Sequence, residues 1–312
     1  AQYESVKPAL RDAAWSAARC NDGTPFAFDL RLAPQPSNAW VIHLQGGLFC
    51  DDNAFPCSAR GAALTTTTPE ADASLHARNL AGIFSRSAGA DPNLAAANHV
   101  QAHYCSSDFW AGATTARRPS TGSAQGWYFS GRANVDALLS ILRQRYGLDD
   151  SNPATEVLFS GSSAGGFGAH LVIAQAEAQL PATTAAGRLR LFVDAGWMTD
   201  WDVAGFRMGA ATVSDRDMWR MARAFWGGTF DPDCEASEAD EASCMFGPGW
   251  YPYVAARVPT FVQQSSIDSS FMSVHGIAGG ATQTMWQSQV EASFADRSEE
   301  RRVGKECRSR WS

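Results

Sequence analysis

A glycine-flanked serine is the residue whose type and surroundings most directly indicate covalent chemistry. Residues 161–165 read Gly-Ser-Ser-Ala-Gly, a G-x-S-x-G pattern centred on Ser163. A short apolar run at 156–159 precedes the pattern, and a helix-favouring segment at 164–178 follows it. A serine on a tight turn from strand to helix presents its hydroxyl as a nucleophile, and the flanking glycines relieve the crowding. The pattern therefore predicts a nucleophile elbow at Ser163, with acyl transfer as its chemistry.

Other uses of a glycine-rich turn fit the sequence less well. A phosphate-binding loop or a plain packing turn would also place glycines at this corner. No Walker-type lysine follows Gly166 or Gly168, and the glycine spacing does not match a dinucleotide-binding fingerprint. The strand before the turn and the helix after it favour the nucleophile.

A glycine pair marks a second part of the same predicted site. Residues 26–45 read as two strands separated by a proline-rich turn, and the second strand ends at Gly46-Gly47. In an α/β hydrolase, backbone N–H groups at the end of an early strand face the elbow and bind the oxyanion. The pair therefore predicts an oxyanion hole, although an ordinary turn has the same composition.

The acid and the base of a triad would follow the serine along the chain. Asp268 comes just after an apolar strand and is the preferred acid, because a carboxylate there can orient an imidazole through its Nδ1 proton. Asp194 also ends a strand and is the second choice. His275 follows Asp268 by only seven residues, which leaves no room for a further strand, so it is a weak candidate for the base.

Strand-like and helix-like segments alternate along the chain. Segments with these periodicities occur at 99–104, 131–146, 189–193, 215–226 and 258–265. The alternation predicts an α/β fold of the α/β hydrolase type, with a mainly parallel sheet and helices on both faces. His43, in an early strand, reads as a structural histidine, and His170, on the elbow helix, reads as a surface or packing residue.

Composition and charge restrict the domain organisation and the partners. The chain has 312 residues, of which 45% are hydrophobic, and a net charge of −7 without a basic cluster in its body, which argues against a nucleic-acid surface. No apolar run is long enough for a membrane span. Residues 297–312 break with this composition, with six Lys or Arg and almost no aliphatic residues. We expect residues 1–296 to form one esterase domain that lacks its C-terminal part, and residues 297–312 to be a foreign, adapter-like tail, with a natural basic tail as the alternative.

Six cysteines remain when Cys307 in the tail is set aside. Two pairs flank short polar or acidic loops, which is typical of disulfide-bridged surface loops. The expected pairs are Cys50 with Cys57, Cys234 with Cys244 and, by remainder, Cys20 with Cys105. Metal binding is the competing interpretation, but no C-x-x-C motif or histidine cluster accompanies it. The even count predicts an oxidising compartment, secreted or periplasmic.

Four motifs occur in the order found in one known family. They read CNDGTP at 20–25, GGLFC at 46–50, YCSSDFWAG at 104–112 and GSSAGG at 161–166. Together they resemble the pectin acetylesterase and Notum family over nearly all of residues 15–275. The resemblance implies an α/β hydrolase fold and a secreted carboxylesterase without metal or cofactor. The residue roles that it implies are Ser163 as nucleophile, Asp268 as triad acid, and Gly47, Leu48 and Ala164 as oxyanion donors.

Two features depart from that family's pattern. Leu48 stands where the family usually has Gly or Trp after the glycine pair, which should alter the wall of the acyl pocket. The family's histidine, well downstream of the acid, has no counterpart here, so we expect the general base to belong beyond Asp296.

The preferred interpretation is a secreted, monomeric Ser-His-Asp carboxylesterase that removes acetyl groups from pectin or a related polysaccharide. A Notum-like lipid or fatty-acyl deacylase is the alternative with the same fold, for which Leu48, Phe49 and Trp197 would line an apolar pocket. A catalytically impaired carbohydrate-binding fragment is the alternative from another class, because the chain lacks a well-placed base.

Overall fold

The computed structural model describes residues 4–7, 13–66, 82–85, 87–89, 91, 93–201, 206–208 and 211–295. The expected foreign tail at 297–312 lies outside these ranges.

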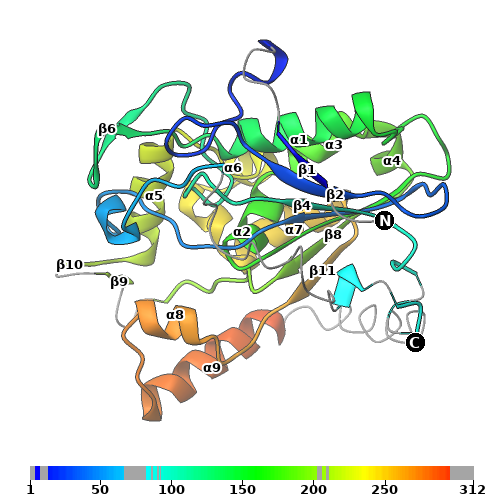
Figure 1. The fold of residues 1–312 in the computed structure, drawn as a ribbon. Coiled ribbons are helices and arrows are strands. Elements are labelled where there is room, and N and C mark those ends of the chain that lie inside the picture. The colour runs from blue at the N-terminus through cyan, green and yellow to red at the C-terminus, as the bar shows by residue number, and fades with distance from the viewer. Residues whose placement is uncertain are drawn as a thin grey trace.

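A seven-stranded sheet forms the centre of the molecule (Figure 1). In spatial order its strands are β1 (Glu4–Val6), β2 (Phe28–Arg31), β4 (Asn98–Ala102), β3 (Ala39–Leu44), β7 (Glu156–Ser162), β8 (Leu189–Asp194) and β11 (Thr260–Gln263). The strands from β4 to β11 pair in parallel, whereas β2 is antiparallel to both of its neighbours. Two separate hairpins are β5 (Arg118–Ser120) with β6 (Ser123–Trp127) and β9 (Phe206–Met208) with β10 (Ala211–Val213). The predicted α/β class with a mainly parallel sheet is confirmed.

Helices connect and cover the strands. The α-helices are α1 (Gly131–Arg145), α2 (Ala164–Leu171), α3 (Ile173–Gln179), α4 (Pro181–Ala185), α5 (Asp215–Trp226), α6 (Pro232–Ser237), α7 (Gly247–Arg257), α8 (Ser269–Val274) and α9 (Gly280–Ala295). Short 3-10 helices occupy Ala13–Trp15, Cys57–Arg60, Gly82–Phe84 and Glu241–Met245. The predicted bounds of α5 are confirmed. Ser214 caps the first turn of this helix by accepting from the Asp217 N–H, and Gly227 ends the helix at a φ of 59°.

The elbow helix is shorter than predicted. One continuous helix was expected over 164–178, but Val172 leaves helical geometry with φ −114° and ψ 7°, and α3 begins at the next residue. Val172 and Ile173 are both β-branched, which lowers helix propensity at this point. The prediction of an unbroken helix is therefore wrong at Val172.

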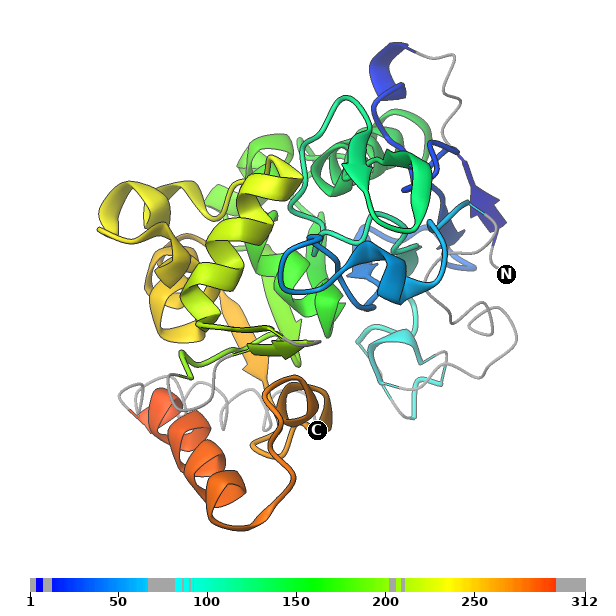
Figure 2. The ribbon, with the colours of Figure 1, turned by 90° about the vertical axis from the view of Figure 1, so that its left-hand side faces the viewer.

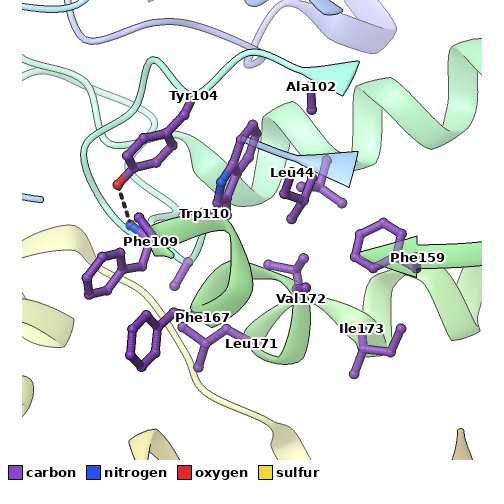
Figure 3. Packing of buried hydrophobic residues seen from close by; sticks show 14 of the residues in the cluster. Leu44, Ala102, Tyr104, Phe109, Trp110, Phe159, Phe167, Leu171, Val172 and Ile173 are labelled. Carbon is purple, nitrogen blue, oxygen red and sulfur yellow. Dashed lines mark hydrogen bonds between the residues drawn. The ribbon is translucent and has the colours of Figure 1, made fainter. Parts of the chain in front are cut away.

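The main core lies between the sheet and the helices of one face. Val157 and Phe159 of β7 belong to this core, together with residues of α1, α2, α3 and α7. Figure 3 shows Phe159 close to Val172 and Ile173 at the end of α2. On the opposite face of β3, Val41 packs in a smaller cluster with Phe84 and Ala97. Alternate residues of each strand therefore supply two different packing surfaces.

The last two helices lie side by side at one edge of the molecule, as both views show (Figures 1 and 2). Met272 of α8 packs with Trp286 and Val290 of α9, and Trp201 completes this cluster. Among the described helices, none has the length and apolar character needed to cross a membrane.

All six cysteines of the body form disulfides. The bridges join Cys20 to Cys105, Cys50 to Cys57 and Cys234 to Cys244, with Cα–Cα distances of 4.8, 4.9 and 5.8 Å. These are the expected pairs, and they leave none of these thiols for a metal ion.

Candidate active site

Ser163 occupies a strained corner between β7 and α2. Its φ of 56° and ψ of −125° fall in a region that non-glycine residues rarely adopt. Its N–H donates to the Asp194 carbonyl over 2.9 Å, and its own carbonyl accepts from the Phe167 N–H over 3.0 Å. Its side chain is exposed. The backbone thus holds the Ser163 hydroxyl out at the end of the sheet, as the elbow prediction requires.

Two glycines allow the chain after β3 to lie directly against this corner. A Cβ at Gly165 would lie 2.0 Å from the Leu44 carbonyl oxygen, which no side chain could tolerate. A Cβ at Gly46 would lie 3.0 Å from the Ser163 Cβ. The segment predicted to form the oxyanion hole is therefore in backbone contact with the elbow.

The expected oxyanion donors have no hydrogen-bond partner among the described residues. In the parallel pairing of β3 with β7, Leu44 lies opposite Gly161, so the residues that follow both strands gather at one edge of the sheet. Within the described ranges, no hydrogen bond engages the N–H groups of Gly47, Leu48 or Ala164. The Ala164 N–H is the first of its helix, where the helix dipole also favours negative charge.

Asp268 leaves the same edge of the sheet, two strands from the elbow. It follows β11, and β8 separates β11 from β7. Its carboxylate caps α8 by accepting from the N–H groups of Ser270 and Phe271 over 3.0 and 3.1 Å. The Gln264 side-chain amide donates to the other carboxylate oxygen over 3.0 Å. Asp268 is thus fixed by its own helix and strand.

Asp194, the second choice for the acid, supports the elbow instead. Its carboxylate accepts from the Ser162 hydroxyl over 2.9 Å, while its carbonyl accepts from the Ser163 N–H. Ala195 next to it also has a positive φ, of 51°. These contacts give Asp194 a structural reason to lie beside the nucleophile.

His275 is held by a different carboxylate from the one expected. Its Nε2 lies 3.1 Å from both carboxylate oxygens of Asp215, and both side chains are fully buried. Its Nδ1 lies 2.8 Å from the Phe271 carbonyl oxygen, to which it must donate. Both ring nitrogens are thus engaged away from Ser163 and Asp268, and the pair instead joins the start of α5 to the end of α8.

His43 and His170 are buried in neutral surroundings. His43 Nδ1 lies 3.0 Å from the Ser160 hydroxyl, and burial lowers the pKa of His43 to about 4. His170 stacks on Trp250 with a centroid distance of 4.3 Å, and burial lowers its pKa to about 3.

No described histidine hydrogen-bonds to Ser163. Of the other two, the His99 Nε2 lies 2.8 Å from the Leu94 carbonyl oxygen and the His103 Nε2 lies 2.7 Å from the Asp29 carboxylate. His76, the sixth histidine of the chain, lies outside the described residues. The structure therefore brings together the serine and the predicted oxyanion segment, but no described histidine forms a hydrogen bond with Ser163.

Comparisons with known proteins identify the family of the chain. A family model described as pectinacetylesterase matches residues 2–308. The palmitoleoyl-protein carboxylesterase Notum of Drosophila melanogaster is 30% identical over 292 residues, which cover 89% of this chain and 40% of that protein. The Notum protein of Homo sapiens is 28% identical over 263 residues, or 83% of this chain and 50% of that protein. This chain therefore spans about half or less of the length of these two relatives.

The fold also has a close counterpart among solved structures. The structure of the Wnt deacylase Notum from Drosophila superposes with a TM-score of 0.76 at 26% sequence identity. The superposition covers 94% of this chain and 81% of that one. The α/β hydrolase-like architecture predicted from the sequence is thereby confirmed.

Proposed function

The chain belongs to the pectinacetylesterase family, and from this premise we propose that it is a serine carboxylesterase in which Ser163 is the nucleophile. One observation carries the proposal. The exposed Ser163 hydroxyl stands on a strained strand-to-helix corner, in backbone contact with a segment whose Gly47 and Leu48 N–H groups have no described partner. That combination serves attack on a carbonyl and binding of the resulting oxyanion.

The reaction is acyl transfer in two steps. Ser163 Oγ forms a bond to the acyl carbon and loses its proton, the oxyanion accepts from the N–H groups of Gly47, Leu48 and Ala164, and the alcohol leaves with a proton. Water then attacks the acyl-enzyme, which releases the acid and restores the serine hydroxyl. Asp268 is the proposed triad acid, because it follows a strand at the same edge of the sheet.

We further propose that none of the described histidines is the base of this triad. The observation behind this is the engagement of His275 by Asp215 and Phe271. A serine hydroxyl without a base is a poor nucleophile. If His76, which lies outside the described residues, is not the base either, ester turnover should be slow. Added imidazole should accelerate it in proportion to concentration. Turnover that is fast and insensitive to imidazole would show that a base is already in place.

Acetyl esters of pectin or a related polysaccharide are the proposed substrates. The family description supports this choice. The three disulfides support secretion into an oxidising compartment, where such polysaccharides occur.

A long-chain deacylase is the second candidate, favoured by the names of the relatives and by Leu48. The Leu48 side chain is 50% exposed beside the predicted oxyanion hole, where it can contact an acyl chain. Phe49 and Trp197, the other expected pocket residues, are instead buried in the core. Trp197 stacks on Phe294, and the contribution of Phe49 and Trp197 to an acyl pocket remains a prediction.

One assay series separates these functions. We would measure hydrolysis of p-nitrophenyl acetate, butyrate and palmitate, and acetate release from acetylated pectin, with wild type and Ser163→Ala. We expect wild type to prefer acetyl esters and Ser163→Ala to lose their hydrolysis. Preference for palmitate would favour the deacylase. Pectin binding with no Ser163-dependent turnover of any ester would leave only a carbohydrate-binding role.

A further inference from the structure

The loop after β4 carries an unusual concentration of backbone strain. Ser107, Phe109 and Trp110 have φ values of 55°, 50° and 64°, in the left-handed region that disfavours residues with a Cβ. Such conformations persist only where the surrounding structure holds them, and they gather at functional sites. The loop lies in the core, because all three side chains are buried.

A buried carboxylate holds this loop in place. Asp108 accepts from the Ser106 hydroxyl over 2.6 Å, from the Trp110 N–H over 3.0 Å and from the Gly131 N–H over 2.8 Å. Its side chain has no exposed surface, and burial raises its pKa to about 6. Three hydrogen bonds to one carboxylate fix the backbone of Trp110 relative to the start of α1.

The Trp110 ring connects the two halves of the proposed oxyanion hole. Its Nε1–H donates to the Gln45 carbonyl over 3.2 Å, one residue before Gly46. Its ring also lies directly on α2, because a Cβ at Gly168 would be 2.3 Å from the ring. Figure 3 shows the ring between Tyr104 and Leu44. Trp110 therefore touches both the segment that leads to Gly47 and the helix that begins with Ala164.

Further hydrogen bonds hold the same residue, Gln45. Its N–H donates to the Ala102 carbonyl over 3.2 Å, and its side-chain oxygen accepts from the Tyr104 N–H over 3.1 Å. The Tyr104 hydroxyl accepts in turn from the Phe109 N–H over 2.8 Å, drawn as a dashed line in Figure 3. The strained loop and the segment before the glycine pair thus form one buried hydrogen-bonded unit.

We propose that Asp108 and Trp110 are positioning residues for the oxyanion hole, with Asp108 fixing Trp110 and Trp110 fixing the Gln45 carbonyl against α2. The peptide that follows Gln45 leads directly to the donors at Gly47 and Leu48, so its orientation sets where their N–H groups point. This inference rests on the proposed function, because it gives those N–H groups their catalytic role. Misplacement of a catalytic group by about 1 Å can lower a rate by roughly a hundredfold.

The test removes one hydrogen bond and keeps an aromatic ring, although a smaller one, at this position. Trp110→Phe should lower kcat for p-nitrophenyl acetate by about tenfold and weaken inhibition by benzeneboronic acid by a similar factor, with KM nearly unchanged. A boronic acid forms a tetrahedral adduct with the serine, so it reports oxyanion binding without turnover. Trp15→Phe is the matched control, because Trp15 Nε1 donates over 3.3 Å to Ser140, nine residues along α1 from Gly131, and no hydrogen bond among the described residues joins Trp15 to Gln45 or α2. It should leave both values within about twofold of wild type.

Two further variants make the outcome decisive. Tyr104→Phe removes only the hydroxyl that accepts from Phe109, and it should lower kcat by about threefold. This variant provides the test if Trp110→Phe fails to fold. Values of kcat and boronate affinity equal to wild type in the folded variants, or equal losses in Trp15→Phe, would overturn the positioning role. Ser163→Ala distinguishes the premise from the inference. If that variant keeps turnover, the serine mechanism fails and this inference with it; if it is inactive, the Trp110 result judges the positioning role alone.

Discussion

Replacing Ser163 in two ways separates its hydroxyl from the strain of its backbone. Ser163→Ala removes Oγ but keeps a Cβ at φ 56° and ψ −125°. Ser163→Gly removes both, and glycine adopts positive φ freely. Release of such strain contributes about 1–3 kcal/mol. The extra freedom of glycine in the unfolded chain offsets about 0.5–1 kcal/mol of this. We therefore expect Ser163→Gly to be more stable than Ser163→Ala by about 1 kcal/mol.

The assay is urea unfolding of both variants, followed by fluorescence, with the same denaturant slope required of each. Both should lack esterase activity. Ser162 supplies the control, because it has no positive φ and lies within β7. There the order should reverse, with Ser162→Gly less stable than Ser162→Ala. The same order at both positions, with alanine the more stable, would refute the strained elbow.

Other predictions concern the buried His170, the proposed acid Asp268 and the disulfide that closes the longest loop. His170 has a folded-state pKa lowered from 6.5 to about 3, so its contribution to stability is present above pH 6.5 and is lost as the pH falls towards 3. Between pH 8 and pH 5, wild type should therefore lose about 2 kcal/mol of its free energy of unfolding because of His170, and His170→Phe should not show this loss. Parallel curves of unfolding free energy against pH for the two proteins would contradict this. Asp268→Ala should cost about 1 kcal/mol in urea unfolding through loss of the α8 cap while Asp268→Asn keeps it, and equal losses would disprove the cap. Replacing Cys20 and Cys105 together by alanine should cost about 4.5 kcal/mol, given a separation of 85 residues, and a loss below about 1 kcal/mol would be incompatible with that loop-closure effect.

Local patterns in the sequence predicted the parts of the fold that depend on local interactions. The predicted helical segment 215–226 matches the bounds of α5, and the elbow followed from a strand, a glycine corner and a helix. The close-set cysteines predicted two disulfides because a short loop limits their partners. The break at Val172 was missed, since two β-branched residues lower helix propensity without specifying an end.

Contacts between distant segments could not be read from the sequence in the same way. His275 pairs with Asp215, which is 60 residues away, and no periodicity indicates which buried carboxylate a histidine will meet. Trp110 and Gln45 are 65 residues apart, and only the sheet order brings them together. The YCSSDFWAG motif contained Trp110, but its strained backbone was not evident from composition.

The central claim is that Ser163 is the nucleophile, and covalent labelling tests it most directly. The protein would be treated with a fluorophosphonate, digested and mapped by mass spectrometry, with imidazole present to assist a slow reaction. The account predicts one phosphonyl adduct on Ser163 and none in Ser163→Ala. An adduct on Ser162 or elsewhere, unchanged in Ser163→Ala, would contradict it.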